Sequence, residues 1–154
     1  MKKFLFDCGT RDHVASAGLL ALRWGFGLMM LIGHGWAKVG MFEAEKDNWS
    51  VPDLPLLSLL SPPMAMVGTI VAEVVCSALL VLGLLTRPAA FVLGFTMLVA
   101  AFQVHGEHPF FMAGGPAKEP ALLYFIPYLV LIISGAGLYS ADAAIYREKR
   151  RKFF

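Results

Sequence analysis

Charged residues are scarce in this sequence. Only 16% of its 154 residues are Asp, Glu, Lys or Arg, whereas 58% are hydrophobic, and the mean hydropathy is +0.67. A soluble domain is about 45 to 50% apolar, and a chain of this length cannot bury such an excess in its own core. The composition therefore excludes an ordinary soluble enzyme and predicts a single-domain integral membrane protein in contact with the lipid bilayer.

Cysteine is also scarce, and several cofactor motifs are missing. Cys8 and Cys76 are far apart, with no CxxC pair and no Cys/His cluster of zinc-finger spacing, which excludes a local thiol–disulfide relay. The sequence has no CxxCH motif, nucleotide fingerprint or phosphate loop. We therefore expect no haem, nucleotide or Fe–S cofactor. We also expect no nucleic-acid partner, because a basic run beside a helix end is more typical of anionic-lipid contact.

Long apolar runs dominate the rest of the chain. A bilayer crossing takes about 20 helical residues, and four segments are candidates: residues 14–36, 64–85, 89–104 and 120–138. Around them lie a polar lead at residues 1–13, loops at residues 37–63 and 105–119, and a basic tail at residues 143–154. We therefore predict an all-α membrane protein, with residues 14–142 forming a four-transmembrane-helix bundle.

The basic residues predict how the bundle is oriented. The lead, the turn at Arg87 and the tail hold three, one and five Lys or Arg, nine in all, whereas the two opposite loops hold only Lys38, Lys46 and Lys118. An even number of spans places the lead and the tail on one side, and the positive-inside rule makes that side cytoplasmic. We expect both termini in the cytoplasm and the two loops outside.

Two ionisable residues lie deep within predicted spans. Arg23 belongs to the first span and Glu73 to the second, and counting from the span ends places both near the membrane midplane. A charged side chain at the bilayer centre costs about 2.5 to 3.5 kcal/mol, so each should face protein rather than lipid. We predict a buried Arg23–Glu73 ion pair. Such a pair would either only lock the two helices together or belong to a proton or cofactor site.

A second polar group collects at the outer ends of the spans. His34 and Lys38 come from the first span, and His105 and His108 follow the third. Their N–H groups suit the two carbonyls of a quinone head group, so these four are candidate quinone-binding residues. A metal site of His34, His105 and His108 is a weaker alternative because no carboxylate has diagnostic spacing, and hydrogen-bonded interfacial histidines are a third. No catalytic residue is identified from the sequence.

The motifs, taken in order, resemble those of a known family. The first span ends in Gly33, His34, Gly35, Trp36 and Lys38; Glu73 precedes the block LGLLTRPAA at residues 82–90; the last two blocks contain Gly114, Gly115 and Glu119, then Gly135, Gly137, Tyr139, Ser140 and Asp142. From roughly Val14 to Asp142 the chain resembles the DoxX family. It differs in a longer loop between the first two spans and in the insertion of Ala117 and Lys118 before Glu119.

The resemblance implies a multi-pass, four-helix protein of the bacterial inner membrane. Some DoxX proteins are linked to thiosulfate oxidation with quinone reduction, and others to oxidative-stress complexes with a superoxide dismutase and a sulfurtransferase. On that pattern Arg23, His34, Lys38 and Glu73 are the matching functional candidates.

These observations favour a small redox-associated membrane protein. It would bind a quinone, or support a soluble sulfur-oxidising or oxidative-stress enzyme, at its outer half, as the subunit of a quinone-linked oxidoreductase. One alternative is a noncatalytic scaffold that recruits soluble enzymes to the membrane. Another is a carrier of small solutes or protons, for which four short helices offer a pathway only in a homo-oligomer.

Overall fold

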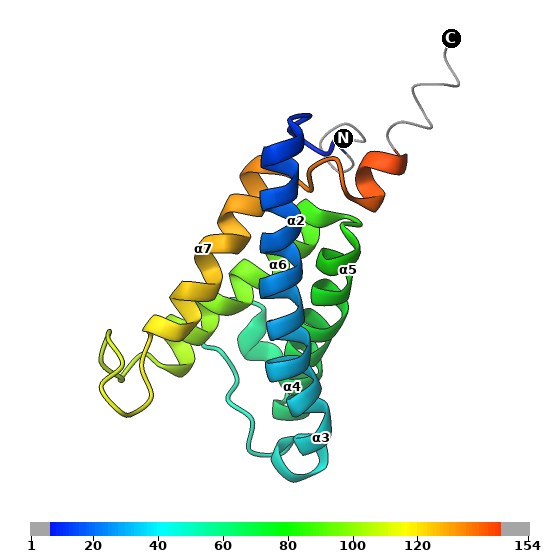
Figure 1. The fold of residues 1–154 in the computed structure, drawn as a ribbon. Coiled ribbons are helices and arrows are strands. Elements are labelled where there is room, and N and C mark those ends of the chain that lie inside the picture. Colours follow the sequence, from blue (N-terminus) through cyan, green and yellow to red (C-terminus); the bar gives the residue numbers. More distant parts are fainter. Residues whose placement is uncertain (1–6, 146–154) are drawn as a thin grey trace.

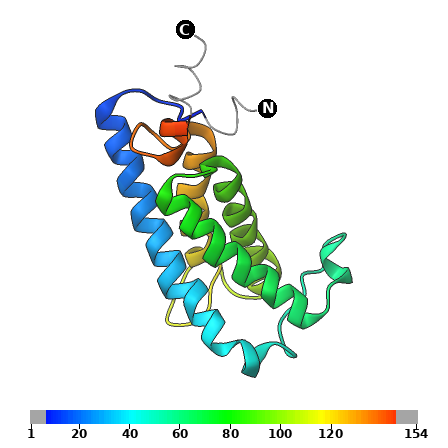
Figure 2. The same ribbon diagram turned by 90° about the vertical axis from the view of Figure 1, so that its right-hand side faces the viewer.

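The computed structural model describes residues 7–145 of the chain, and all regular secondary structure in that part is helical. The helices form an elongated bundle (Figures 1 and 2). The first six residues of the lead and most of the basic tail, which the orientation prediction uses, lie outside the described residues.

The first helical rod is longer than the sequence predicts. It consists of α2 (His13–Leu28), η1 (Met29–Gly35) and α3 (Trp36–Glu45), which continue one another over 33 residues. Its start is capped by the Asp12 side chain, which accepts a hydrogen bond from the backbone N–H of Ala15 at 2.7 Å. The sequence prediction ended this span at residue 36 because charges appear beyond it. The helix continues because the residues that follow are mostly good helix formers and include no proline.

Three further helical rods complete the bundle. The second consists of α4 (Pro62–Val71), η3 (Ala72–Cys76) and α5 (Ser77–Leu82), the third of α6 (Thr86–Val99) and η4 (Ala100–Val104), and the fourth of α7 (Glu119–Ser134). A short 3₁₀ turn, η2 (Leu57–Leu59), lies in the loop before α4. The first three rods are long and apolar enough to cross a membrane, whereas α7 is apolar but shorter.

The four rods pack as a closed bundle. The first contacts the second and fourth through α2, and α6 contacts both α5 and α7. Small side chains on α6 allow α7 to approach closely: Ala89 and Ala90 are buried, and the ring of Phe125 lies beside Gly94. Many large apolar side chains remain exposed on the outside of the rods, which provides a surface for lipid.

The two ends of the described chain lie at one end of the bundle. Figure 1 shows the beginning of α2 and the segment after α7 together at the top, and the loops that precede α4 and α7 toward the bottom. At that end the start of the chain and the segment after α7 are joined by hydrogen bonds, since Gly137 N–H donates to the carbonyl of Cys8 at 2.9 Å and Leu138 N–H donates to Ser16 Oγ at 3.0 Å. We call this end the terminal end, and the opposite end, with the loops before α4 and α7, the loop end.

Candidate functional site

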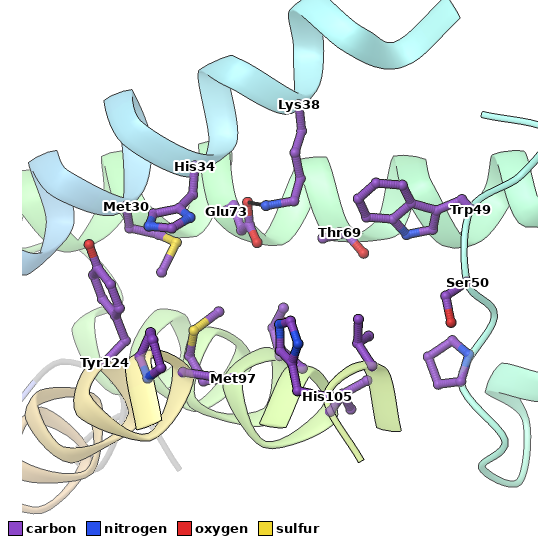
Figure 3. A pocket seen from close by; sticks show the side chains of 17 residues that line it. Met30, His34, Lys38, Trp49, Ser50, Thr69, Glu73, Met97, His105 and Tyr124 are labelled. Atoms are coloured by element: carbon purple, nitrogen blue, oxygen red, sulfur yellow. Dashed lines mark hydrogen bonds and ion pairs between the residues drawn. The ribbon is translucent and has the colours of Figure 1, made fainter. Parts of the chain in front are cut away.

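A cavity of about 360 Å³ lies between the rods at the loop end. Its polar lining comes from every rod and from the adjoining loops: His34, Lys38, Ser50, Thr69, Glu73, Thr96, His105 and Tyr124. Most of the remaining lining is apolar, including Met30 and Met97. Figure 3 shows His34 and Glu73 facing His105 and Met97 across this space. A few convergent polar groups on apolar walls, at this volume, are typical of a site for a small organic molecule.

An ion pair lies in one wall of this cavity. Lys38 reaches from α3 to η3 and its Nζ lies 2.7 Å from Glu73 Oε2, with the two side chains 19% and 4% exposed (Figure 3). The Glu73 carboxylate therefore has a cationic partner in a place where an unpaired charge would be costly. The predicted Arg23–Glu73 ion pair is wrong, because Glu73 pairs with Lys38 instead.

Arg23 lies outside the cavity, toward the terminal end. Its buried guanidinium donates through Nη1 to the carbonyls of Leu80 and Val81, at 3.2 and 3.3 Å, and through Nη2 to the carbonyl of Tyr139 at 2.6 Å. Leu80 and Val81 belong to the last turn of α5, where the carbonyl groups have few intrahelical partners and the helix dipole is negative. Arg23 therefore caps the end of α5 and ties it to the segment after α7. It is not among the residues that line the cavity.

His34 and Tyr124 form another wall of the cavity. Their rings meet edge to face, with centroids 5.3 Å apart and an interplanar angle of 83°, and both line the cavity. The imidazole and the phenol each bring a hydrogen-bond donor to the site. Tyr124 was not among the site residues predicted from the sequence.

The other two histidine candidates are separated by their positions. His105 lines the cavity and His108 does not. Their Nδ1 atoms are 3.0 Å apart, so one ring donates and the other accepts. Burial, and to a lesser extent His108, lowers the pKa of His105 below its usual value. The neutral form of His105 is thereby favoured. Within residues 7–145, no group of three or more His, Cys, Asp or Glu side chains is arranged to hold a metal ion, so His34, His105 and His108 do not form one.

The loop after the first rod covers part of the cavity. Trp49, Ser50 and Pro52 line it, and Figure 3 shows Trp49 and Ser50 at one end of the cavity. The backbone N–H of Asp53 donates to Gln103 Oε1 at 3.3 Å, which holds the loop against η4. These loop residues were not predicted from the sequence. A tryptophan within a polar loop was the one available signal, since buried or interfacial surfaces favour this side chain.

A π-helical turn occurs in each of the first three rods at the level of the cavity. His34 lies in η1, Glu73 in η3, and His105 directly follows η4. The backbone hydrogen bonds have the π-helical spacing of five residues: Trp36 N–H donates to the carbonyl of Leu31, and His105 N–H donates to the carbonyl of Ala100. π-Helical turns are rare in proteins as a whole, and many of those that occur lie at functional sites. Each here introduces one polar cavity residue.

Comparison with known proteins places the chain in a family. A family model described as DoxX matches residues 18–106, more than half of the chain. A protein of Haemophilus influenzae is 36% identical over 123 residues, which cover 77% of this chain and 84% of that protein. A second protein from the same organism is 28% identical over 146 residues, or 90% of each chain. Both are described only as uncharacterized proteins, and no solved structure matches.

Proposed function

This chain belongs to the DoxX family of membrane proteins, and on that premise we propose that its cavity binds the head group of a quinone. The arrangement of Lys38, Glu73, His34, His105 and Tyr124 around one apolar-walled space is the observation that supports this proposal. A quinone ring is flat, apolar on both faces and polar only at its two carbonyl oxygens. It would contact the apolar walls through its faces and accept hydrogen bonds at its oxygens.

The polar groups also suit the chemistry of a bound quinone. Reduction of a quinone to a quinol takes two electrons and two protons. Glu73, Lys38 and His105 are titratable groups at the cavity, and they are the candidates to hold and transfer those protons. The electrons would come from a soluble partner that oxidises a reduced sulfur compound, which would make this chain the membrane subunit of a quinone-linked oxidoreductase.

The orientation belongs to the same proposal. We place both termini in the cytoplasm of a bacterium and the loop end on the outer side of the inner membrane. The structure moves Lys38 into the cavity, so the two loops keep only Lys46 and Lys118, and the charge asymmetry becomes larger than the sequence count suggested. The soluble partner would then approach the loop end, where Phe110, Phe111 and Met112 are exposed.

Equilibrium binding of a quinone tests the proposal. Purified protein in lipid nanodiscs should bind a soluble ubiquinone or menaquinone analogue saturably, and His34→Ala should weaken binding about tenfold by removing a hydrogen bond and an aromatic wall. His13→Ala is the matched control, because His13 lies at the terminal end and contacts Tyr139 instead. Absence of saturable binding, or equal losses in both variants, would exclude the cavity as a quinone site.

A further inference from the structure

A second cavity adjoins the first. It has a volume of about 210 Å³ and lies between the second and third rods, with Leu57 of η2 in its lining. Four residues line both cavities: Pro52, Thr69, Thr96 and Val99. The two spaces therefore adjoin along these four residues. We call the second space the chain groove.

The chain groove differs sharply from the first cavity in polarity. Apart from the two shared threonines its lining is apolar, with Leu57 and Leu60 from the loop and Val92 and Phe95 from α6. The threonine hydroxyls donate within their own helices, Thr69 Oγ1 to the carbonyl of Ala65 at 3.0 Å and Thr96 Oγ1 to that of Val92 at 2.9 Å. The groove thus offers no free hydroxyl hydrogen to a ligand and suits only an apolar group.

The chain groove opens at the lipid-facing surface of the bundle. Val92 and Phe95 are 39% and 44% exposed although they line it, so the groove reaches the surface of the bundle. Both residues belong to a rod apolar enough to cross a membrane, and the surroundings at that surface would be lipid. A hydrocarbon chain entering the groove would therefore pass from the bilayer to the polar cavity without crossing water.

From this junction we propose that the ligand of the first cavity is a prenylated quinone whose isoprenoid chain lies in the chain groove. The inference rests on the proposed quinone function and names the part of the ligand that the polar cavity does not accommodate. The head group lies among His34, Glu73 and His105. The chain leaves past Thr69 and Thr96 and reaches the lipid beside Phe95.

The charges at the polar cavity favour a quinone over a phospholipid in this place. Lys38 is already paired with Glu73 at 2.7 Å, and the neutral form of His105 is favoured. A phosphate entering the cavity would find no unpaired Lys or Arg among the residues that line it and would approach the Glu73 carboxylate. A head group without charge, with carbonyl acceptors only, avoids this repulsion.

A glycine in the chain groove provides the test. Gly68 lines the groove on α4, and a Cβ placed there meets no atom within 4 Å, so Gly68→Phe fills the groove without distorting the helix. It should weaken binding of a long-chain ubiquinone about tenfold or more and leave a chainless quinone within about twofold of the unchanged protein. The effect is steric, because a chain that leaves lipid for an apolar groove gains little from the hydrophobic effect.

Two further variants control for the added aromatic side chain and for misfolding. Gly18→Phe introduces the same side chain at an exposed glycine of α2 with open space around it, outside both cavities, and should change neither affinity. Val92→Trp fills the groove from α6 and should reproduce the selective loss, so that misfolding of either groove variant alone does not decide the outcome. Unchanged thermal unfolding of each variant checks that it is folded.

The possible outcomes separate the two proposals. If the unchanged protein binds neither quinone, the proposed function fails and this inference fails with it. If it binds the chainless quinone but the groove variants lose both quinones equally or neither, only the chain assignment is overturned. If native mass spectrometry finds a phospholipid that Gly68→Phe releases and that excess long-chain quinone does not displace, the groove belongs to a phospholipid and the inference is wrong.

Discussion

Lys38 and Glu73 form the ion pair on which the candidate site is built. The carboxylate is almost fully buried, whereas the ammonium keeps some exposure. Removing one partner of a buried pair leaves an uncompensated charge, while replacing both by apolar groups is often close to neutral for stability. Stability and ligand binding can therefore be separated at this pair.

We predict that Lys38→Met lowers the free energy of unfolding by about 3 kcal/mol, because it leaves the Glu73 carboxylate buried without a cation. The double variant Lys38→Met/Glu73→Met should recover most of that stability and still bind quinone poorly. Reversible unfolding in detergent and equilibrium quinone binding, measured on the same samples, check this.

The control for that prediction is the ion pair of Lys46 and Glu43, whose Nζ and Oε2 are 2.6 Å apart with the glutamate side chain 81% exposed. Lys46→Met should leave the free energy of unfolding almost unchanged, since exposed pairs contribute little. A double variant that binds quinone as tightly as the unchanged protein would show that the Lys38–Glu73 pair is only structural.

At the scale of elements, the turn between α5 and α6 depends on a residue from the far end of the chain. α6 begins without a cap of its own, because the residue before it is Leu85 in a left-handed conformation. The buried carboxylate of Asp142 supplies the cap, accepting from Leu85 N–H at 2.9 Å and from Thr86 N–H at 3.0 Å. A negative charge at a helix N-terminus also interacts favourably with the helix dipole.

We expect Asp142→Ala to destabilise the fold by about 2 to 3 kcal/mol, since two partly or fully buried N–H groups lose their acceptor. Asp12→Ala, which removes the exposed cap of α2, should cost only about 1 kcal/mol. The midpoints of thermal unfolding compare the two variants. Equal shifts would contradict the structural importance assigned to the Asp142 cap.

The helical elements also show which parts of the fold can be predicted from the sequence. The number of apolar runs, their order and the polar residues they carry are local properties, and the DoxX assignment from those motifs is confirmed. The end of the first rod was placed too early, because the charges after residue 36 suggested a loop although the helix continues to Glu45. The π-helical turns were not predicted, since they depend on packing and have no simple sequence signature.

At the scale of the whole molecule, the bundle has two chemically distinct ends. The terminal end is closed by backbone hydrogen bonds and by Arg23, whereas the loop end contains the cavity, with the loop that carries Trp49 over it. The proposed orientation puts the closed end toward the cytoplasm and the cavity in the outer half of the membrane. That arrangement determines which side a soluble partner can reach.

Labelling of single cysteines tests the orientation. In a Cys8→Ser/Cys76→Ser background, Asn48→Cys at the loop end should react with a membrane-impermeant maleimide in intact spheroplasts, and Thr10→Cys at the terminal end should react only after lysis. Neither substitution changes a charge that the positive-inside rule counts. Both sites should be labelled in detergent, and the reverse pattern in spheroplasts would overturn the proposed orientation.

The sequence by itself determined that the protein is helical and apolar enough for a membrane. It identified six polar candidates, Arg23, His34, Lys38, Glu73, His105 and His108, of which four line the cavity. Hydropathy and helix length suffice for this, because lipid requires long apolar helices whatever their neighbours are. Only the tertiary structure decided which residues meet. In an unbroken α-helix Arg23 and Lys38 would lie on one face, but η1 lies between them, and one extra residue in a turn rotates everything beyond it by about 100°. Arg23 therefore faces the end of α5, while Lys38 faces Glu73 and the cavity.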